Sequence, residues 1–213
     1  IICNSELWVV PMNDGVKRYS INNNFSLKAH YNQSSADYPL TSNIVTCIAY
    51  NQQSNNIIIG TDGGGINIFN LENNRPADPI DNYALLSTTY ILPIDNNHIV
   101  CCISRNGIAD VKKNFAVTLS KNSDNENTAL SSNSIMSILQ DGYESNVIWF
   151  GTEGHGINKY VYALNTGEKD YVETYPLTNS LKVSSMANID RDHLLVLFKN
   201  NGLVLFYNNK DTF

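Results

Sequence analysis

Polar side chains gather in five short turns of the sequence, each of which ends in a glycine. The turns carry carboxylates, amides, an arginine and a histidine, and such groups bind the hydroxyls of a polar ligand such as a sugar. The candidate ligand contacts in these turns are Asn13, Asp62, Arg105, Glu153, His155 and Asn200. For any single Asn or Asp, a role in the turn itself is the stronger explanation. Arg105 and His155 are the better candidates, because neither is favoured in tight turns.

A sugar site also needs an aromatic face, which Tyr38 and Tyr175 are candidates to supply. Tyr38 lies in a segment that leads from one repeat to the next. Further polar candidates in these connections and in the turns are Asp14, Thr41, Asn43, Gly63, Asn106, Asn133, Thr178 and Asn201. Trp8 and Trp149 fall at the same place in two repeats, and the same holds for Tyr19, Phe69, Tyr160 and Phe206. We interpret these aligned aromatics as packing residues rather than ligand platforms.

Other chemistries have weaker support. The segments GTDGGG and GTEGHG lack the Gly-Lys-Ser/Thr sequence and the following helix of a phosphate loop. There is no metal-ligand spacing such as CxxC or HExxH and no nucleophile motif such as GxSxG. The sequence therefore predicts no cofactor, no metal and no catalytic residue. The one enzymatic alternative is polysaccharide cleavage, in which Asp62 and Glu153, at equivalent turns, would be the pair of carboxylates.

The elements that carry these turns are repeats. Two segments, 42–70 and 132–160, share Ser-Asn, an apolar run, a polar loop, a second apolar run ending in Gly-Thr, a glycine turn, Gly-Ile-Asn and an aromatic. Three weaker copies share only the frame. The turn glycines are Gly15, Gly65, Gly107, Gly156 and Gly202, at separations of 50, 42, 49 and 46 residues. Short strands at such a period are typical of a β-propeller.

The sequence thus predicts an all-β chain of about five consecutive four-stranded blades. The expected blades are 1–38 (partial), 39–85, 86–130, 131–176 and 177–213 (partial). The second should have strands at 44–50, 57–61, 66–70 and near 82–85, and the fourth at 135–140, 147–152, 157–162 and 169–175. We expect a partial ring of a seven-bladed propeller, with a five-bladed ring as the alternative. Exposed strand edges of such a partial ring favour self-association.

Charge and composition narrow the function further. The net charge is −6 and Lys and Arg form no cluster along the chain, which argues against direct binding of nucleic acid. No apolar run approaches the roughly 18 residues of a membrane span. Cys3, Cys47, Cys101 and Cys102 are interpreted as small buried hydrophobic residues, with a disulfide left open.

The segments 42–70 and 132–160 resemble the two-component regulator propeller repeat, through Ser-Asn, Gly-Thr, the glycine turn and the final aromatic. This resemblance implies the periplasmic sensor region of a hybrid two-component histidine kinase. Such a region binds oligosaccharide and controls phosphorelay-driven transcription. The resemblance also implies that the parent protein forms a homodimer and meets the membrane only through its own span. The alternatives are a propeller that binds another protein and a polysaccharide-active propeller enzyme.

Overall fold

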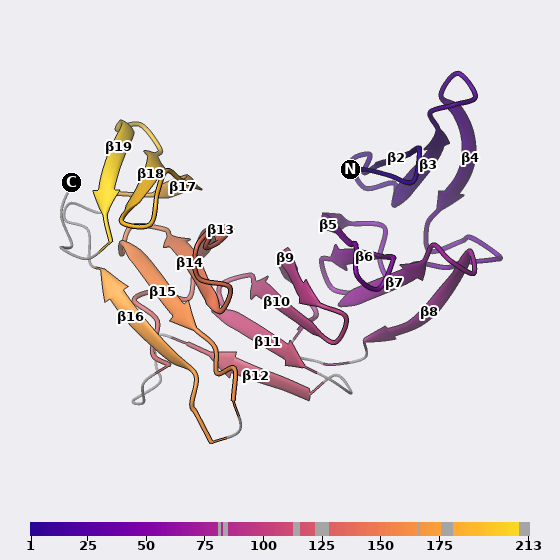
Figure 1. Ribbon diagram of the computed structural model, residues 1–213. Helices are drawn as coiled ribbons and strands as arrows, with labels where there is room; N and C mark the ends of the chain where they lie inside the picture. The colour runs from indigo at the N-terminus through magenta and orange to yellow at the C-terminus, as the bar shows by residue number, and fades with distance from the viewer. Residues whose placement is uncertain are drawn as a thin grey trace. The chain divides into compact units, whose positions relative to one another are not determined.

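The computed structural model describes residues 1–80, 82, 85–112, 116–121, 128–165, 167–175 and 181–208. Apart from a 3-10 turn at Leu85, the regular elements assigned in these residues are β-strands, which confirms the all-β prediction. The strands form five separate sheets, four of four strands and one of three (Figure 1). In each sheet the strands lie side by side in chain order, as in the blades of a propeller, and we number the sheets as blades 1 to 5.

The strand bounds follow the repeat. Blade 1 contains β1 (Ile2–Cys3), β2 (Glu6–Val9), β3 (Val16–Ser20) and β4 (Ser26–Tyr31). Blade 2 contains β5 (Val45–Asn51), β6 (Asn56–Thr61), β7 (Ile66–Asn70) and β8 (Arg75–Ile80). Blade 3 contains β9 (Thr88–Asp95), β10 (His98–Ile103), β11 (Ile108–Lys112) and β12 (Ala116–Ser120). Blade 4 contains β13 (Ile135–Gln140), β14 (Val147–Thr152), β15 (Ile157–Val161) and β16 (Tyr171–Tyr175). Blade 5 contains β17 (Val183–Asn188), β18 (His193–Phe198) and β19 (Gly202–Tyr207).

One predicted strand is wrong. The fourth strand of blade 2 was expected near 82–85, but β8 occupies Arg75–Ile80. The sequence of β8 is RPADPI, and its two prolines suggest a loop. Proline is nevertheless accepted on an edge strand, where a missing N–H does not interrupt an interior ladder, and β8 pairs only with β7. In blade 4 the predicted bounds agree with the strands to within two residues.

The chain divides into two compact units, which are described separately. Unit 1 comprises Ile1–Ile103 and Ala109–Thr118, and therefore blades 1 and 2 and most of blade 3. Unit 2 comprises Ser104–Ile108 and Leu119–Phe213, and therefore blades 4 and 5 together with the turn between β10 and β11. In the part of the chain that the structure describes, there is no helix long and apolar enough to cross a membrane.

Three aromatic rings form the centre of a core in each unit. In unit 1, the ring centroid of Trp8 lies 5.9 Å from that of Tyr31 and 5.4 Å from that of Phe69, between blades 1 and 2. In unit 2, the ring of Trp149 lies 5.8 Å from Tyr175 and 6.4 Å from Phe206, between blades 4 and 5. Both indoles are almost fully buried. The packing interpretation of Trp8 and Trp149 is therefore confirmed.

The aligned aromatic residues of the third strands are also buried, with one exception. Phe69, Tyr160 and Phe206 are buried, whereas Tyr19 is only half-buried. The residue facing each indole across the hairpin is a cation, Arg18 opposite Trp8 and Lys159 opposite Trp149. The Arg18 guanidinium lies 5.3 Å from the Trp8 ring and the Lys159 ammonium lies 5.8 Å from the Trp149 ring. These distances fit cation–π contacts, which add to the packing of both cores.

The cation of blade 1 also takes part in a buried ion pair. Arg18 donates hydrogen bonds to both carboxylate oxygens of Glu6, at 2.6 and 2.8 Å, and Lys28 adds a third at 2.6 Å. Burial alone would raise the pKa of Glu6, but the hydrogen bonds from Arg18 and Lys28 outweigh it and lower that pKa. Glu6 is therefore held ionised beneath the aromatic core.

The Gly-Thr pair of the two strong repeats has a structural cause. A Cβ added to Gly151 would lie 2.3 Å from Cγ1 of Val183, the first residue of the neighbouring blade, so only glycine allows this close approach. Gly60 is confined in the same way by Cys47 and Thr88. The Thr61 and Thr152 hydroxyls donate to the carbonyls of Gly65 and Gly156, at 2.8 and 2.7 Å, and so close the glycine turns.

The four cysteines form no disulfide; Cys3, Cys101 and Cys102 are buried as expected, whereas Cys47 is only partly buried. Cys47 is partly exposed, yet burial of its thiol raises its pKa to about 11. The structure thus places all four thiols in environments that disfavour the thiolate.

We predict that Cys47 in the native protein reacts with iodoacetamide about 100-fold more slowly at pH 8 than an unperturbed thiol, because a rise of two pKa units lowers the thiolate fraction by that factor. The same shift predicts that the contribution of the Cys47 thiol to the free energy of unfolding is fully present below pH 9. This contribution falls as the pH rises from 9 towards 11, because the thiol ionises first in the unfolded chain. Mass spectrometry of alkylation with and without urea measures the first effect. Equal rates in both conditions would contradict it.

Candidate functional site

The turn between the second and third strands of each blade has a fixed geometry. The residue two places before the turn glycine has a positive φ in all five blades, and these residues are Asn13 (+54°), Gly63 (+81°), Arg105 (+53°), Gly154 (+88°) and Asn200 (+70°). Gly and Asn adopt this left-handed conformation at little cost. The turn itself therefore accounts for Asn13 and Asn200 without any ligand.

Arg105 does not fit this explanation. It takes the left-handed conformation at the position where the other four blades have Gly or Asn. An ordinary side chain pays roughly 1–2 kcal/mol for this conformation. Ser5 and Phe25 also have a positive φ, so this conformation alone assigns no function to Arg105, and the neighbours of its side chain decide its interest as a candidate.

The turns lie at the same end of the sheets as the segments that lead into the next blade. The turn glycines donate to carbonyls of these segments: Gly15 N–H to Asn43 at 3.1 Å, Gly65 N–H to Leu86 at 3.2 Å, and Gly107 N–H to Asn133 at 3.0 Å. Both kinds of connection therefore share one face at each of these places. The Thr178 candidate lies outside the described residues.

Unit 2 concentrates positive charge at this face. The Lys182 ammonium donates a hydrogen bond to the Glu153 carboxylate, and the two residues also form a backbone bridge. The hydrogen bond and charge of Lys182 lower the pKa of Glu153, and the charges of Arg105 and Lys199 lower it further. Lys182 thus contacts the carboxylate directly, and the charges of Arg105 and Lys199 act on the same carboxylate, on an exposed surface of a chain whose net charge is −6. We call Arg105, Glu153, Lys182 and Lys199 the cationic cluster.

The cationic cluster is suited to binding and poorly suited to acid catalysis. A general acid at neutral pH needs a raised pKa, and the pKa of Glu153 is lowered. The guanidinium of Arg105, in contrast, offers several donors in one plane, which match the oxygens of a carboxylate or sulfate. The arrangement therefore favours a ligand that carries negative charge.

His155 and Asn200 lie in turns that also supply members of the cluster. The His155 backbone N–H donates to the Thr152 hydroxyl at 3.1 Å, and its Nδ1 lies 3.2 Å from the Glu153 carbonyl oxygen. Its imidazole is exposed. Asn200 is likewise exposed and directly follows Lys199. Both side chains are thus accessible to a ligand held by the cluster.

The candidates in unit 1 have different partners. Asp62 accepts a hydrogen bond from the Ser87 hydroxyl at 2.7 Å, at the place in blade 2 that corresponds to Glu153 and Lys182 in blade 4. Asn13 is exposed next to Asp14, whose carboxylate lies 2.9 Å from Lys17 Nζ and 3.1 Å from His30 Nε2. These carboxylates are matched by hydroxyl, lysine or histidine neighbours, and no excess of positive charge arises around them.

The prediction that Tyr38 offers an aromatic face is wrong. Its side chain is 3% exposed, and its ring lies 5.4 Å from Tyr31 and 5.6 Å from Phe69 in the core of unit 1. Its hydroxyl donates to the Ile68 carbonyl at 3.0 Å. Tyr175 is similarly packed against Trp149. The apolar ring surface gains more from burial between blades than from exposure to water, and the hydroxyl still finds an acceptor.

Sequence reasoning missed two members of the cluster, Lys182 and Lys199. Lys199 was detectable, because it directly precedes Asn200 in a turn that was already selected. Lys182 was not, because its proximity to Glu153 arises only from pairing between residues 29 positions apart. Within the described ranges, no group of three or more His, Cys, Asp or Glu residues is arranged to hold a metal ion.

Comparisons with known proteins identify the fold. No protein-family model matches the chain. No curated protein matches it in sequence. Its structure is similar to the extracellular domain of the putative hybrid two component system BT3049 from B. thetaiotaomicron (15% identity, TM-score 0.71, 97% of this chain and 26% of that chain). The corresponding domain of BT4673, from the same organism, is also similar (13% identity, TM-score 0.56, 98% and 34%).

A third similar structure is the β-propeller domain of Cps50 (Swd1) from Myceliophteria thermophila (9% identity, TM-score 0.66, 95% of this chain and 62% of that chain). These similarities show that the chain has the fold of a β-propeller. The chain spans less than two thirds of each of the three structures.

Proposed function

We propose that this chain is part of the extracytoplasmic sensor region of a hybrid two-component system, located in the periplasm, and that it binds an oligosaccharide. In this proposal, binding controls a phosphorelay and hence transcription through other parts of the parent protein. The fold is shared with the extracellular domains of two putative hybrid two-component systems, which supports the proposal. The resemblance of the repeats at 42–70 and 132–160 supports it independently.

The observation that carries the ligand proposal is Arg105. Its left-handed backbone is unfavourable for arginine, and its side chain belongs to the cationic cluster with Lys182 and Lys199. We therefore propose an oligosaccharide with carboxylate or sulfate groups, held by Arg105 and the two lysines, with hydroxyls bound by His155 and Asn200.

Thermal unfolding of the chain with a panel of acidic and neutral oligosaccharides tests this proposal. A ligand present at 100 times its Kd stabilises the native state by about 2.7 kcal/mol, which is a readily measured shift in Tm. We expect the shift with acidic members of the panel, and we expect it to decrease as salt is added.

Arg105→Asn is the informative variant. Asn accepts the left-handed conformation, so we expect no loss of stability, together with at least tenfold weaker binding of the acidic oligosaccharide. The matched control is Arg191→Asn, which removes the same charge from the turn between β17 and β18, at the opposite end of blade 5. Equal binding by wild type and Arg105→Asn would show that the cationic cluster is not part of the ligand site. Stabilisation by neutral sugars alone would contradict an acidic ligand and indicate that the ligand is a neutral oligosaccharide.

The remaining parts of the proposal concern the parent protein. We propose that the chain supplies consecutive blades of a seven-bladed propeller and that the parent protein is a homodimer attached to the membrane by its own span. The small share of the BT3049 and BT4673 domains that this chain covers supports a larger assembly. Analytical ultracentrifugation of the complete extracytoplasmic region would test the dimer.

A further inference from the structure

Three equivalent positions determine how each blade packs against the next. The first position lies on the second strand, seven residues before the turn glycine. The second lies on the third strand of the next blade, four residues after that blade's turn glycine. The third lies on the fourth strand, where it pairs with the residue that follows the first blade's turn glycine. In the two aromatic cores these positions are Trp8, Phe69 and Tyr31 in unit 1, and Trp149, Phe206 and Tyr175 in unit 2. Each set of three rings fills the space between two blades.

Between blades 2 and 3, inside unit 1, all three positions are aliphatic. Ile58 replaces the tryptophan, Val111 replaces the phenylalanine, and Ile80, which pairs with Ile66, replaces the tyrosine. The residue opposite Ile58 is Ile68, where the other two cores have a cation. Three large rings are thus exchanged for three small side chains at equivalent places.

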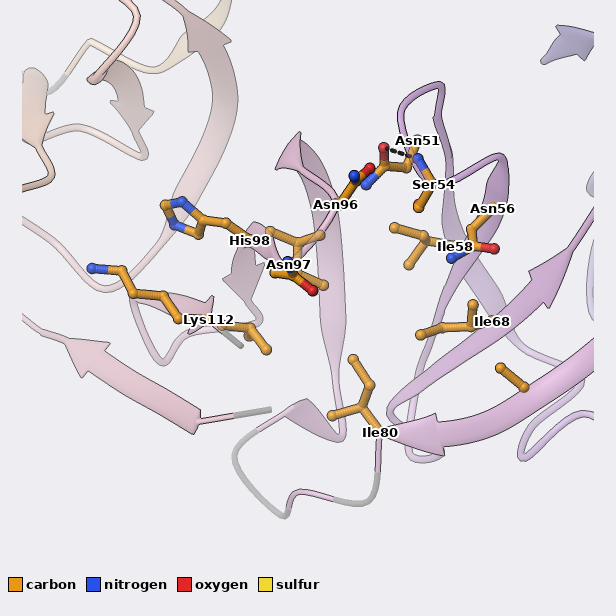
Figure 2. A pocket seen from close by; sticks show the side chains of 13 residues that line it. Asn51, Ser54, Asn56, Ile58, Ile68, Ile80, Asn96, Asn97, His98 and Lys112 are labelled. Atoms are coloured by element: carbon orange, nitrogen blue, oxygen red, sulfur yellow. Dashed lines mark hydrogen bonds between the residues drawn. The ribbon is translucent and has the colours of Figure 1, made fainter. Parts of the chain in front are cut away.

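A cavity of about 340 Å³ lies at this place, and Ile58, Ile80 and Val111 all line it. Figure 2 shows Ile58 and Ile68 on one side of the cavity and Asn97 on the other. The cavity is partly open to solvent, whereas the other two cores are occupied by their aromatic rings. The cavity therefore corresponds to the space that aromatic rings occupy in the other two cores.

The wall of the cavity has an apolar and a polar part. The apolar part is formed by Ile58, Ile68, Ala77, Ile80, Ile99 and Val111, and an apolar cavity of only about 150 Å³ is enough to bind benzene. The polar part is formed by Ser54 together with Asn51, Asn56, Asn96, Asn97, His98 and Lys112. One polar group in the wall has an unused capacity for hydrogen bonding: Ser54 Oγ is buried and has no hydrogen-bond partner in the part of the chain that the structure describes. Buried hydroxyls are normally satisfied, so this group favours a ligand with one donor or acceptor.

We propose that the cavity binds a planar aromatic molecule of about the size of an indole ring, carrying one hydrogen-bonding group directed at Ser54. The ligand takes the place that the Trp8 and Trp149 side chains occupy in the other cores. This site is separate from the cationic cluster and does not depend on the proposed function. It provides a second binding site, for a small aromatic compound.

Ligand-observed NMR with indole as the probe tests the proposal. We expect saturable binding to the wild-type chain and its loss in Ile58→Trp, since the new indole side chain fills the same space. The matched control is Leu195→Trp, which adds a tryptophan at the equivalent position of blade 5 and should leave binding unchanged. If Ile58→Trp does not fold, Ile58→Phe adds a smaller ring that fills part of the cavity and should weaken binding several-fold.

Ser54 is tested with indene, which has the shape of indole without its N–H. Wild type should bind indole more tightly than indene, and Ser54→Ala should abolish this preference. Absence of saturable indole binding by the wild type would overturn the proposal. Equal binding by wild type and Ile58→Trp would overturn it as well, because the probe would then be bound elsewhere.

Discussion

Replacing Trp149 with alanine is expected to lower the free energy of unfolding by about 3–5 kcal/mol, the range for deleting a large buried aromatic side chain. The indole is 0% exposed and packs against both Tyr175 and Phe206. Its Nε1–H donates a hydrogen bond to the Asp141 carboxylate at 2.7 Å, so the substitution also leaves that carboxylate without this donor. Urea unfolding followed by far-UV circular dichroism measures the effect.

The control for this experiment is Leu164→Ala, which shortens a side chain that is 61% exposed in the same unit. It should change the free energy of unfolding by less than about 0.5 kcal/mol, as is usual for surface substitutions. A loss in Trp149→Ala as small as that of the control would mean that the interface between blades 4 and 5 does not depend on its aromatic core.

The second large effect is expected for Gly151→Ala, which should destabilise the protein by about 1–3 kcal/mol through overpacking. The new Cβ would meet Cγ1 of Val183 at 2.3 Å and the Ser137 hydroxyl oxygen at 2.4 Å, so the two blades must move apart. The backbone of Gly151 is not left-handed, and the effect is therefore steric. Thermal and urea unfolding both report it.

A double-mutant cycle distinguishes this steric effect from a general loss. Val183→Ala removes the clashing methyl group, so Gly151→Ala should cost less in that background than in the wild type. Gly142→Ala serves as the control, because its nearest neighbours are side-chain atoms of Asn188 at 3.4 Å or more. The Ser137 hydroxyl at 2.4 Å and Val183 Cβ at 2.6 Å remain in this background, so additive costs for Gly151→Ala and Val183→Ala would refute only the Val183 methyl group as the source of the clash.

The sequence was sufficient for those parts of the fold that depend on local chemistry. The turn glycines and the strands on either side of them were predictable, because a tight hairpin needs positive φ and the apolar runs alternate. The strand β8 was missed, because its two prolines obscure an edge strand. The packing of Trp8 and Trp149 was predicted, but the cavity at Ile58 was not, because it depends on how three strands of two blades meet.

The candidate site was predictable only residue by residue. Arg105 stood out because arginine is unusual in such turns, and its positive φ adds a physical reason to that choice. Tyr38 failed, because a tyrosine in a connecting segment gives no sign in the sequence of whether it turns outwards or into a core. The pairing of Glu153 with Lys182 depends on tertiary structure and therefore could not be derived from spacing.

The outermost strand of blade 2 has a consequence for association between molecules. Pro76 and Pro79 carry no amide hydrogen, so β8 has fewer backbone donors than other strands of its length, and such donors are what an incoming strand from another copy would need. Five of its six residues are exposed, and it would otherwise be a template for intermolecular sheet growth. The two prolines therefore make this margin of blade 2 a poor template for sheet growth.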